Sequence, residues 1–191
     1  MKKFTTKFIR SNHVESVHNI KILVSDINNN ILLSSKNDND FIFPRSSIKI
    51  FQAIPFILSN SVKHYNLSPK EIALSCSSHR GEIYHISQLN KWINKIGISK
   101  RKLKCGIHYP LNPNASKKLI QLKKLPDELH NNCAGKHLAM ITSCLKSNYD
   151  MKNYLDFHHP HQIKIRKVFQ KFTSKKIYSK SFGIDGCSAP Q

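Results

Sequence analysis

Two short apolar runs lie near the start of the chain. Residues 20–24 and 31–33 are mostly aliphatic or β-branched, and the polar residues 26–30 separate them. Apolar runs of this length, bounded by a polar turn, are typical of β-strands. We therefore expect a β-hairpin near the N-terminus.

Farther along, the apolar positions recur with the period of an α-helix. Ser68 is suited to cap one helix, because Pro69 follows at its first position and Glu71 stands at the third place of a capping box. Helices are expected over residues 46–59, 67–74, 87–96, 136–145 and 161–172, and loops over residues 112–116 and 183–190. The pattern predicts a mixed α and β fold, rich in helix, in a single domain spanning residues 1–191.

The chain is strongly basic. Lysine and arginine number 31 against 11 acidic residues, which gives a formal net charge of +20. Such a charge can indicate a nucleic-acid or anionic-membrane partner. Only five of the basic residues are arginine, the residue that most often reads base edges, and the lysines are dispersed. The chain is also rich in Asn and Ile, so the codon bias of an AT-rich genome explains the excess of lysine better than a binding function does. We therefore expect neither a nucleic-acid nor a membrane partner.

The chain carries no recognisable export or membrane segment. Its basic residues 1–10 lead into polar residues, and no apolar run approaches the roughly 20 residues of a membrane span. The five cysteines are an odd number, which argues against a disulfide framework. We expect a cytoplasmic protein whose thiols are reduced.

The first candidate for chemistry is the pair Ser46 and Lys49. The Ser-x-x-Lys spacing puts a hydroxyl and an amine one helical turn apart. A neutral lysine amine can act as the base for a serine nucleophile, and apolar residues surround this helix, which predicts burial. The alternative is that Ser46 caps the helix and Lys49 extends into water.

Three later stretches cluster polar and sulfur-bearing residues, over residues 75–82, 130–137 and 183–190. Cys133 and Cys187 could both contribute to a zinc site, because thiolates are favoured zinc ligands. The alternative is that both are small core residues, which is common for cysteine.

A second zinc arrangement is also open. Cys105-x-x-His108 and His130-x-x-Cys133 have the pair spacing of a zinc finger, and with the basic charge they would form a nucleic-acid-binding module. The helix that follows is apolar over residues 138–141 and is poorly suited to a DNA groove. This basic zinc-binding module is the alternative to an enzyme.

The clusters, in this order, resemble the asparaginase II family, the thermolabile rhizobial-type L-asparaginases. The matching stretches are Val14-Glu15-Ser16-x-His18, Arg45-Ser46-x-x-Lys49-x-Phe51-Gln52, Ser77-Ser78-His79-x-Gly81-Glu82, Cys105-Gly106-x-His108-x-Pro110, His130-Asn131-Asn132-Cys133-x-Gly135-Lys136-His137 and Gly183-Ile184-Asp185-Gly186-Cys187-x-Ala189-Pro190. Any one of these motifs is weak, but six in order are specific. The resemblance implies a fold like that of serine β-lactamases and glutaminases.

The resemblance implies hydrolysis of L-asparagine to L-aspartate and ammonia. Ser46 would be the nucleophile, Lys49 its base and Ser78 the second active-site serine. Arg45 would hold the substrate carboxylate, a pairing that suits a guanidinium.

The resemblance also implies a zinc ion bound by Cys133, Lys136 and Cys187. Asp185 would border the zinc and the substrate amine. Asparagine and a second copy of the chain, in a homodimer, are the partners considered.

Members of this family continue beyond the 183–190 motif. The resemblance therefore implies that this chain is the N-terminal portion of such a domain, with the C-terminal part missing. That part would supply a second lysine for Ser78 and further strands. We accordingly expect impaired activity.

Overall fold

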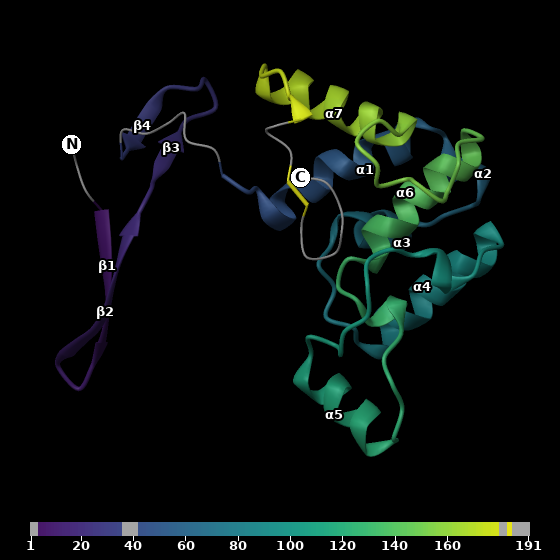
Figure 1. The fold of residues 1–191 in the computed structure, drawn as a ribbon, viewed down its shortest axis with the longest axis horizontal. Helices are drawn as coiled ribbons and strands as arrows, with labels where there is room; N and C mark the ends of the chain where they lie inside the picture. Colours follow the sequence, from purple (N-terminus) through teal and green to yellow (C-terminus); the bar gives the residue numbers. More distant parts are fainter. Residues whose placement is uncertain (1–3, 36–41, 180–182, 185–191) are drawn as a thin grey trace. The chain divides into compact units, whose positions relative to one another are not determined.

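The computed structural model describes residues 4–35, 42–179 and 183–184 of the chain. It divides into two compact units, Met1–Ile42 and Phe43–Gln191. The first unit holds strands and the second holds helices, as the ribbon in Figure 1 shows. The expected mixed, helix-rich fold class is confirmed; a likeness to serine β-lactamases stays a prediction.

The first unit contains two antiparallel hairpins. Strand β1 (Phe4–Arg10) pairs with β2 (His13–Ile20), and β3 (Leu23–Ser25) pairs with β4 (Ile31–Ser34). The β3–β4 hairpin confirms the predicted one, although Ile20 belongs to β2. Its turn is held by Asp26, whose Oδ1 accepts the backbone N–H groups of Asn28 and Asn30, each at 2.8 Å.

Helix α6 (Ala134–Lys146) is the centre of the second unit. Eleven of its 13 residues are buried, because other helices contact it on several sides. These neighbours are α1 (Lys49–Leu58), α2 (Ser61–His64), α3 (Pro69–Cys76), α4 (Ile83–Ile96) and α7 (Pro160–Thr173). The core includes Trp92, whose ring lies 5.5 Å from that of Phe56 and whose Nε1 donates to Thr142 Oγ1 at 3.1 Å.

A glycine lets α3 and α6 approach closely. A Cβ atom added to Gly135 would lie 2.2 Å from the carbonyl oxygen of Leu74. That distance is far inside van der Waals contact, so only glycine fits here without moving a helix. The contact brings the end of α3 next to the start of α6.

Among its described residues, the second unit also has three short 3₁₀ helices: η1 (Arg45–Ile48), η2 (Lys100–Lys102) and η3 (Glu128–His130). The capping prediction for α3 is confirmed: Ser68 is its N-cap, Pro69 its first residue and Glu71 closes the capping box. Both α6 and α7 lie where helices were expected. Among the described residues, no helix is long and apolar enough to cross a membrane.

Three expectations need correction. The predicted loop over residues 112–116 is wrong, because Asn112 caps α5 (Pro113–Gln121) through its Oδ1, which accepts from Asn114 N at 2.9 Å and Ala115 N at 3.0 Å. Helix α4 starts at residue 83 rather than 87. The segment 46–59 is not buried all round, since Ile50 is 59% and Leu58 75% exposed.

Candidate functional site

The junction of η1 with α1 and the loop that follows α3 bring two serines and a lysine together. Ser46 Oγ lies 2.9 Å from Ser78 Oγ. Lys49 Nζ lies 2.7 Å from Ser78 Oγ and donates to the carbonyl oxygen of Ser77 at 2.8 Å. Three residues predicted for catalysis thus form one continuous chain of hydrogen bonds, Ser46–Ser78–Lys49.

The backbone around Ser46 explains this placement. Helix η1 carries Ser46, and Lys49 opens α1, so the two side chains are one turn apart. Lys49 is only 2% exposed, whereas Ser46 and Ser78 are exposed. The lysine is therefore buried in the helical unit, while the two serines lie at its surface. Its amine bonds to Ser78 rather than directly to Ser46, the residue that it was expected to serve.

Arg45 precedes the nucleophile candidate in a strained conformation. Its φ is +54°, in the left-handed region that non-glycine residues seldom adopt. The side chain is exposed, next to the Ser46 hydroxyl in sequence. Strained backbone of this kind persists where the surrounding structure fixes it, often at functional sites.

The loop after Ser78 is anchored by His79. Its backbone N–H donates to the carbonyl oxygen of Asn132 at 3.2 Å, and its Nδ1 accepts the N–H of Gly81 at 3.2 Å. The ring is 3% exposed and stacks on His85, with centroids 5.3 Å apart. Burial, together with the nearby His85 and Lys49, lowers the pKa of His79 to about 3. The ring is therefore neutral near pH 7 and adds no positive charge beside Lys49.

Asn132 connects this loop to two further segments. Its backbone N–H donates to His108 Nε2 at 3.2 Å, while His108 Nδ1 donates to the carbonyl oxygen of Tyr109 at 2.6 Å. The thiol of Cys133 donates to Asn132 Oδ1 at 3.6 Å. Asn132 therefore fixes the position of Cys133 relative to the loop that carries Ser78.

Cys133 and Lys136, two of the predicted zinc ligands, lie at the start of α6, Cys133 as its N-cap residue and Lys136 in its first turn. Cys133 is 7% and Lys136 2% exposed. The spacing of three residues puts both on one face of the helix. The other two predicted residues, Asp185 and Cys187, lie outside the described residues. Within the described ranges, no three His, Cys, Asp or Glu side chains are grouped so as to hold a metal.

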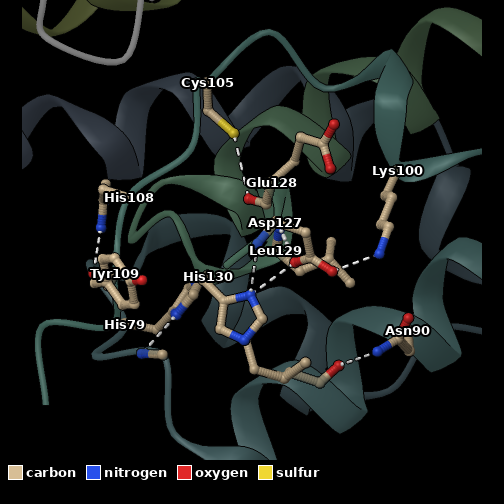
Figure 2. A network of polar contacts seen from close by, with 12 residues as sticks. His79, Asn90, Lys100, Cys105, His108, Tyr109, Asp127, Glu128, Leu129 and His130 are labelled. Atoms are coloured by element: carbon tan, nitrogen blue, oxygen red, sulfur yellow. Dashed lines mark hydrogen bonds and ion pairs between the residues drawn. The ribbon is translucent and has the colours of Figure 1, made fainter. Parts of the chain in front are cut away.

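All four residues of the two finger-like pairs are described, and their segments touch through Asn131 and Asn132, but no three of the four are grouped so as to hold a metal. Figure 2 shows their separate partners: the Cys105 thiol points to the carbonyl oxygen of Glu128 at 3.6 Å, and His130 Nδ1 lies 2.8 Å from Asp127 Oδ1. Lys100 also bonds to Asp127 at 2.5 Å. This network supports the turn at η3 rather than a zinc finger.

The sequence motifs indicated no role for the carbonyl of Ser77, the ring of His79 or the amide of Asn132. Ser77 contributes its backbone carbonyl, which no residue type reveals, and Asn132 contributes both backbone groups and its side-chain oxygen. His79 was part of a polar cluster, but its burial could be known only from the fold.

One comparison with known proteins gives a match. The family model described as L-asparaginase II matches residues 6–191. Comparison with curated protein sequences gives no match.

Proposed function

Because the chain belongs to the L-asparaginase II family, a family of amidohydrolases acting on asparagine, we propose that it uses Ser46 as the nucleophile that attacks the side-chain amide of L-asparagine. The observation that carries this proposal is the hydrogen-bonded chain Ser46–Ser78–Lys49. A nucleophilic serine needs a base within hydrogen-bond reach, directly or through one intermediate group.

The geometry supports a two-step proton path. In the structure Lys49 Nζ donates to both the Ser77 carbonyl and Ser78 Oγ. As a neutral amine it would keep the first bond and accept the Ser78 hydroxyl proton with its lone pair. As Ser78 gives up that proton, its oxygen takes the proton of Ser46. The Ser46 Oγ then forms a bond to the amide carbon of asparagine.

Collapse of the resulting intermediate breaks the carbon–nitrogen bond. The proton held by Lys49 passes to Ser78 Oγ as the Ser78 hydroxyl gives its own proton to the leaving nitrogen, which departs as ammonia. Water then attacks the β-aspartyl ester, its proton passes to Ser46 Oγ, and L-aspartate is released. Each step uses the same three side chains.

Arg45 is the proposed anchor for the substrate carboxylate. Its guanidinium is adjacent to Ser46 in the chain and exposed, so it is accessible to a bound amino acid. A guanidinium binds a carboxylate through two parallel charge-assisted hydrogen bonds. Asp185 is proposed to bind the substrate amine.

Zinc is the proposed cofactor, with Cys133, Lys136 and Cys187 as its ligands. The donor chemistry fits, because the buried turn at the start of α6 offers a thiol and an amine on one face. When bound, zinc would supply a fixed positive charge that orders the pocket. The Asn132 contacts would hold Cys133 in place for it.

The test is ammonia release from asparagine by the purified chain, compared with Ser46→Ala. We expect Ser46-dependent turnover and at least a 10³-fold lower rate in the variant, since loss of a nucleophile removes the covalent path. Acid quench and peptide mapping should locate a β-aspartyl ester on Ser46. Equal rates in both proteins, or an ester on another residue, would refute the assignment.

A further inference from the structure

A pocket of about 490 Å³ lies between α3 and α4. Its lining includes Ser77 but not Ser46, Ser78 or Arg45. The pocket is therefore beside the candidate catalytic residues and separate from them. Its volume falls within the range of small-molecule sites.

The charged groups around this pocket are all cationic. Lys70 comes from α3 and Lys91 from α4, and neither ammonium group forms an ion pair or hydrogen bond with any residue that the structure describes. No described carboxylate lines the pocket.

The two nearest carboxylates in the sequence are already engaged. Glu71 is fully buried, bonds to Ser68 and pairs with Lys95 at 2.9 Å. Glu82 accepts from Asn112 Nδ2 at 2.8 Å. Neither carboxylate forms an ion pair with Lys70 or Lys91, although the charge of Glu82 reaches His85 in the lining. The two lysines therefore give this part of the pocket a charge that favours an anion.

The remaining lining sets the shape and polarity of a ligand. Ala73 and Leu74 form an apolar wall, and the rings of Tyr84 and His85 lie 3.9 Å apart on the opposite helix. Ser87 and Gln88 add hydrogen-bonding groups. This combination suits a flat or short apolar body that carries one negative group.

We propose that this pocket is a binding site for a small organic carboxylate, whose apolar body lies between α3 and Tyr84 and whose carboxylate lies between Lys70 and Lys91. The site is distinct from the proposed substrate site. Its test requires no turnover, so it succeeds or fails independently of the proposed function.

The experiment is a titration of the 191-residue chain with benzoate, in which binding is measured by calorimetry and by ligand-observed NMR. Benzamide, a neutral molecule of nearly the same shape, is the matched ligand, and inorganic phosphate tests for binding of charge alone. We expect saturable benzoate binding with a Kd on the order of 1 mM, the range for a ligand of so few atoms. Benzamide and phosphate should bind at least about fivefold more weakly. Benzamide lacks the negative charge that would contact the lysines, and phosphate lacks the apolar body that would contact α3 and Tyr84.

Variants locate the site. Lys70→Gln combined with Lys91→Gln should weaken benzoate binding about 10-fold, because the double variant loses two solvent-exposed contacts between an ammonium group and the carboxylate. Lys117→Gln with Lys118→Gln removes the same charge from α5, outside the pocket, and should leave Kd unchanged, as should Arg45→Gln. Near-ultraviolet circular dichroism verifies that each variant is folded.

Four results would overturn the proposal. They are no saturable binding of benzoate, equal binding of benzoate and benzamide, equal weakening by the α5 variant, or loss of binding in Arg45→Gln. The last would place the carboxylate at the substrate site instead.

Discussion

Ser78 is the residue on which the proposed proton path depends most, because its hydroxyl contacts both Lys49 and Ser46. In the proposal Lys49 would contribute the basic group and Ser46 the attacking oxygen, but the two side chains form no hydrogen bond with each other in this structure. Removing the intermediate hydroxyl should therefore interrupt the transfer while both end groups remain.

Ser78→Ala should lower kcat for asparagine by about 10²–10⁴-fold, the usual effect of losing general-base assistance. KM should change little, because the substrate carboxylate is assigned to Arg45. Ser116→Ala in α5 is the matched control and should retain full activity. Steady-state ammonia release measures both, and an unchanged kcat in Ser78→Ala would exclude the path through Ser78.

Substitution of Cys133 tests the proposed zinc site. We expect about one zinc ion per chain in metal analysis, lost in Cys133→Ser and retained in Cys105→Ser, whose thiol bonds to the Glu128 carbonyl. The affinity for zinc should decrease as the pH is lowered, because thiols and amines must lose their protons to bind zinc. Loss of zinc in Cys105→Ser but not in Cys133→Ser would favour the finger-like arrangement.

At the scale of elements, the contact between α3 and α6 determines where Ser78 lies. Gly135 permits the close approach, and the Ser78 loop follows α3 directly. A side chain at position 135 would meet backbone atoms of Leu74, which cannot rotate away. The two helices would have to separate.

Gly135→Ala should destabilise the protein by about 1–3 kcal/mol, the usual cost of overpacking, even after the better helix propensity of alanine is counted. Gly97→Ala is the matched control. Its φ is +67° but a Cβ there meets nothing within 4 Å, so it should cost only about 1 kcal/mol from the backbone. Urea denaturation compares the two, and a Gly135→Ala no less stable than Gly97→Ala would contradict the packing argument.

The elements that could be predicted from sequence are those with strong local signals. Ser68, Pro69 and Glu71 define the start of α3 by contacts within one turn, and the structure has them in those roles. The β1–β2 hairpin was missed because its turn, Ser11 and Asn12, lacks the glycine that usually marks a two-residue turn.

For the candidate site, too, the residues could be predicted from sequence but their arrangement in space could not. Motifs and family resemblance indicated Ser46, Lys49 and Ser78 as separate positions along the chain. Their order in space, with Ser78 between the other two, depends on how α3 packs on α1 and α6, which local sequence does not encode.

At the scale of the whole molecule, buried histidines link stability to pH. His161 is fully buried at the start of α7, and neither ring nitrogen has a hydrogen-bond partner among the described residues. Burial, with His159 and Lys164 nearby, lowers its pKa to about 3, as burial also does for His79. Both rings stay neutral in the fold but take up protons in the unfolded chain below about pH 6.5.

Stability should therefore be insensitive to these two groups above pH 6.5 and should fall as the pH drops from 6.5 towards 3. The slope is at most about 1.4 kcal/mol per pH unit for each histidine, since the unfolded state binds the additional proton. His161→Leu should reduce this slope, whereas substitution of the exposed His158 by Leu should not. Urea unfolding from pH 7 to pH 4 measures it, and equal slopes in the wild type and His161→Leu would contradict the assignment.

The left-handed backbone of Arg45 has a consequence for how this sequence can evolve. An arginine in that conformation costs about 1–2 kcal/mol relative to glycine. A library of variants selected only for heat resistance should therefore enrich Arg45→Gly, whereas one selected for growth on asparagine as nitrogen source should remove it. Under the proposed role of Arg45, stability of the fold and catalysis would favour different amino acids at position 45.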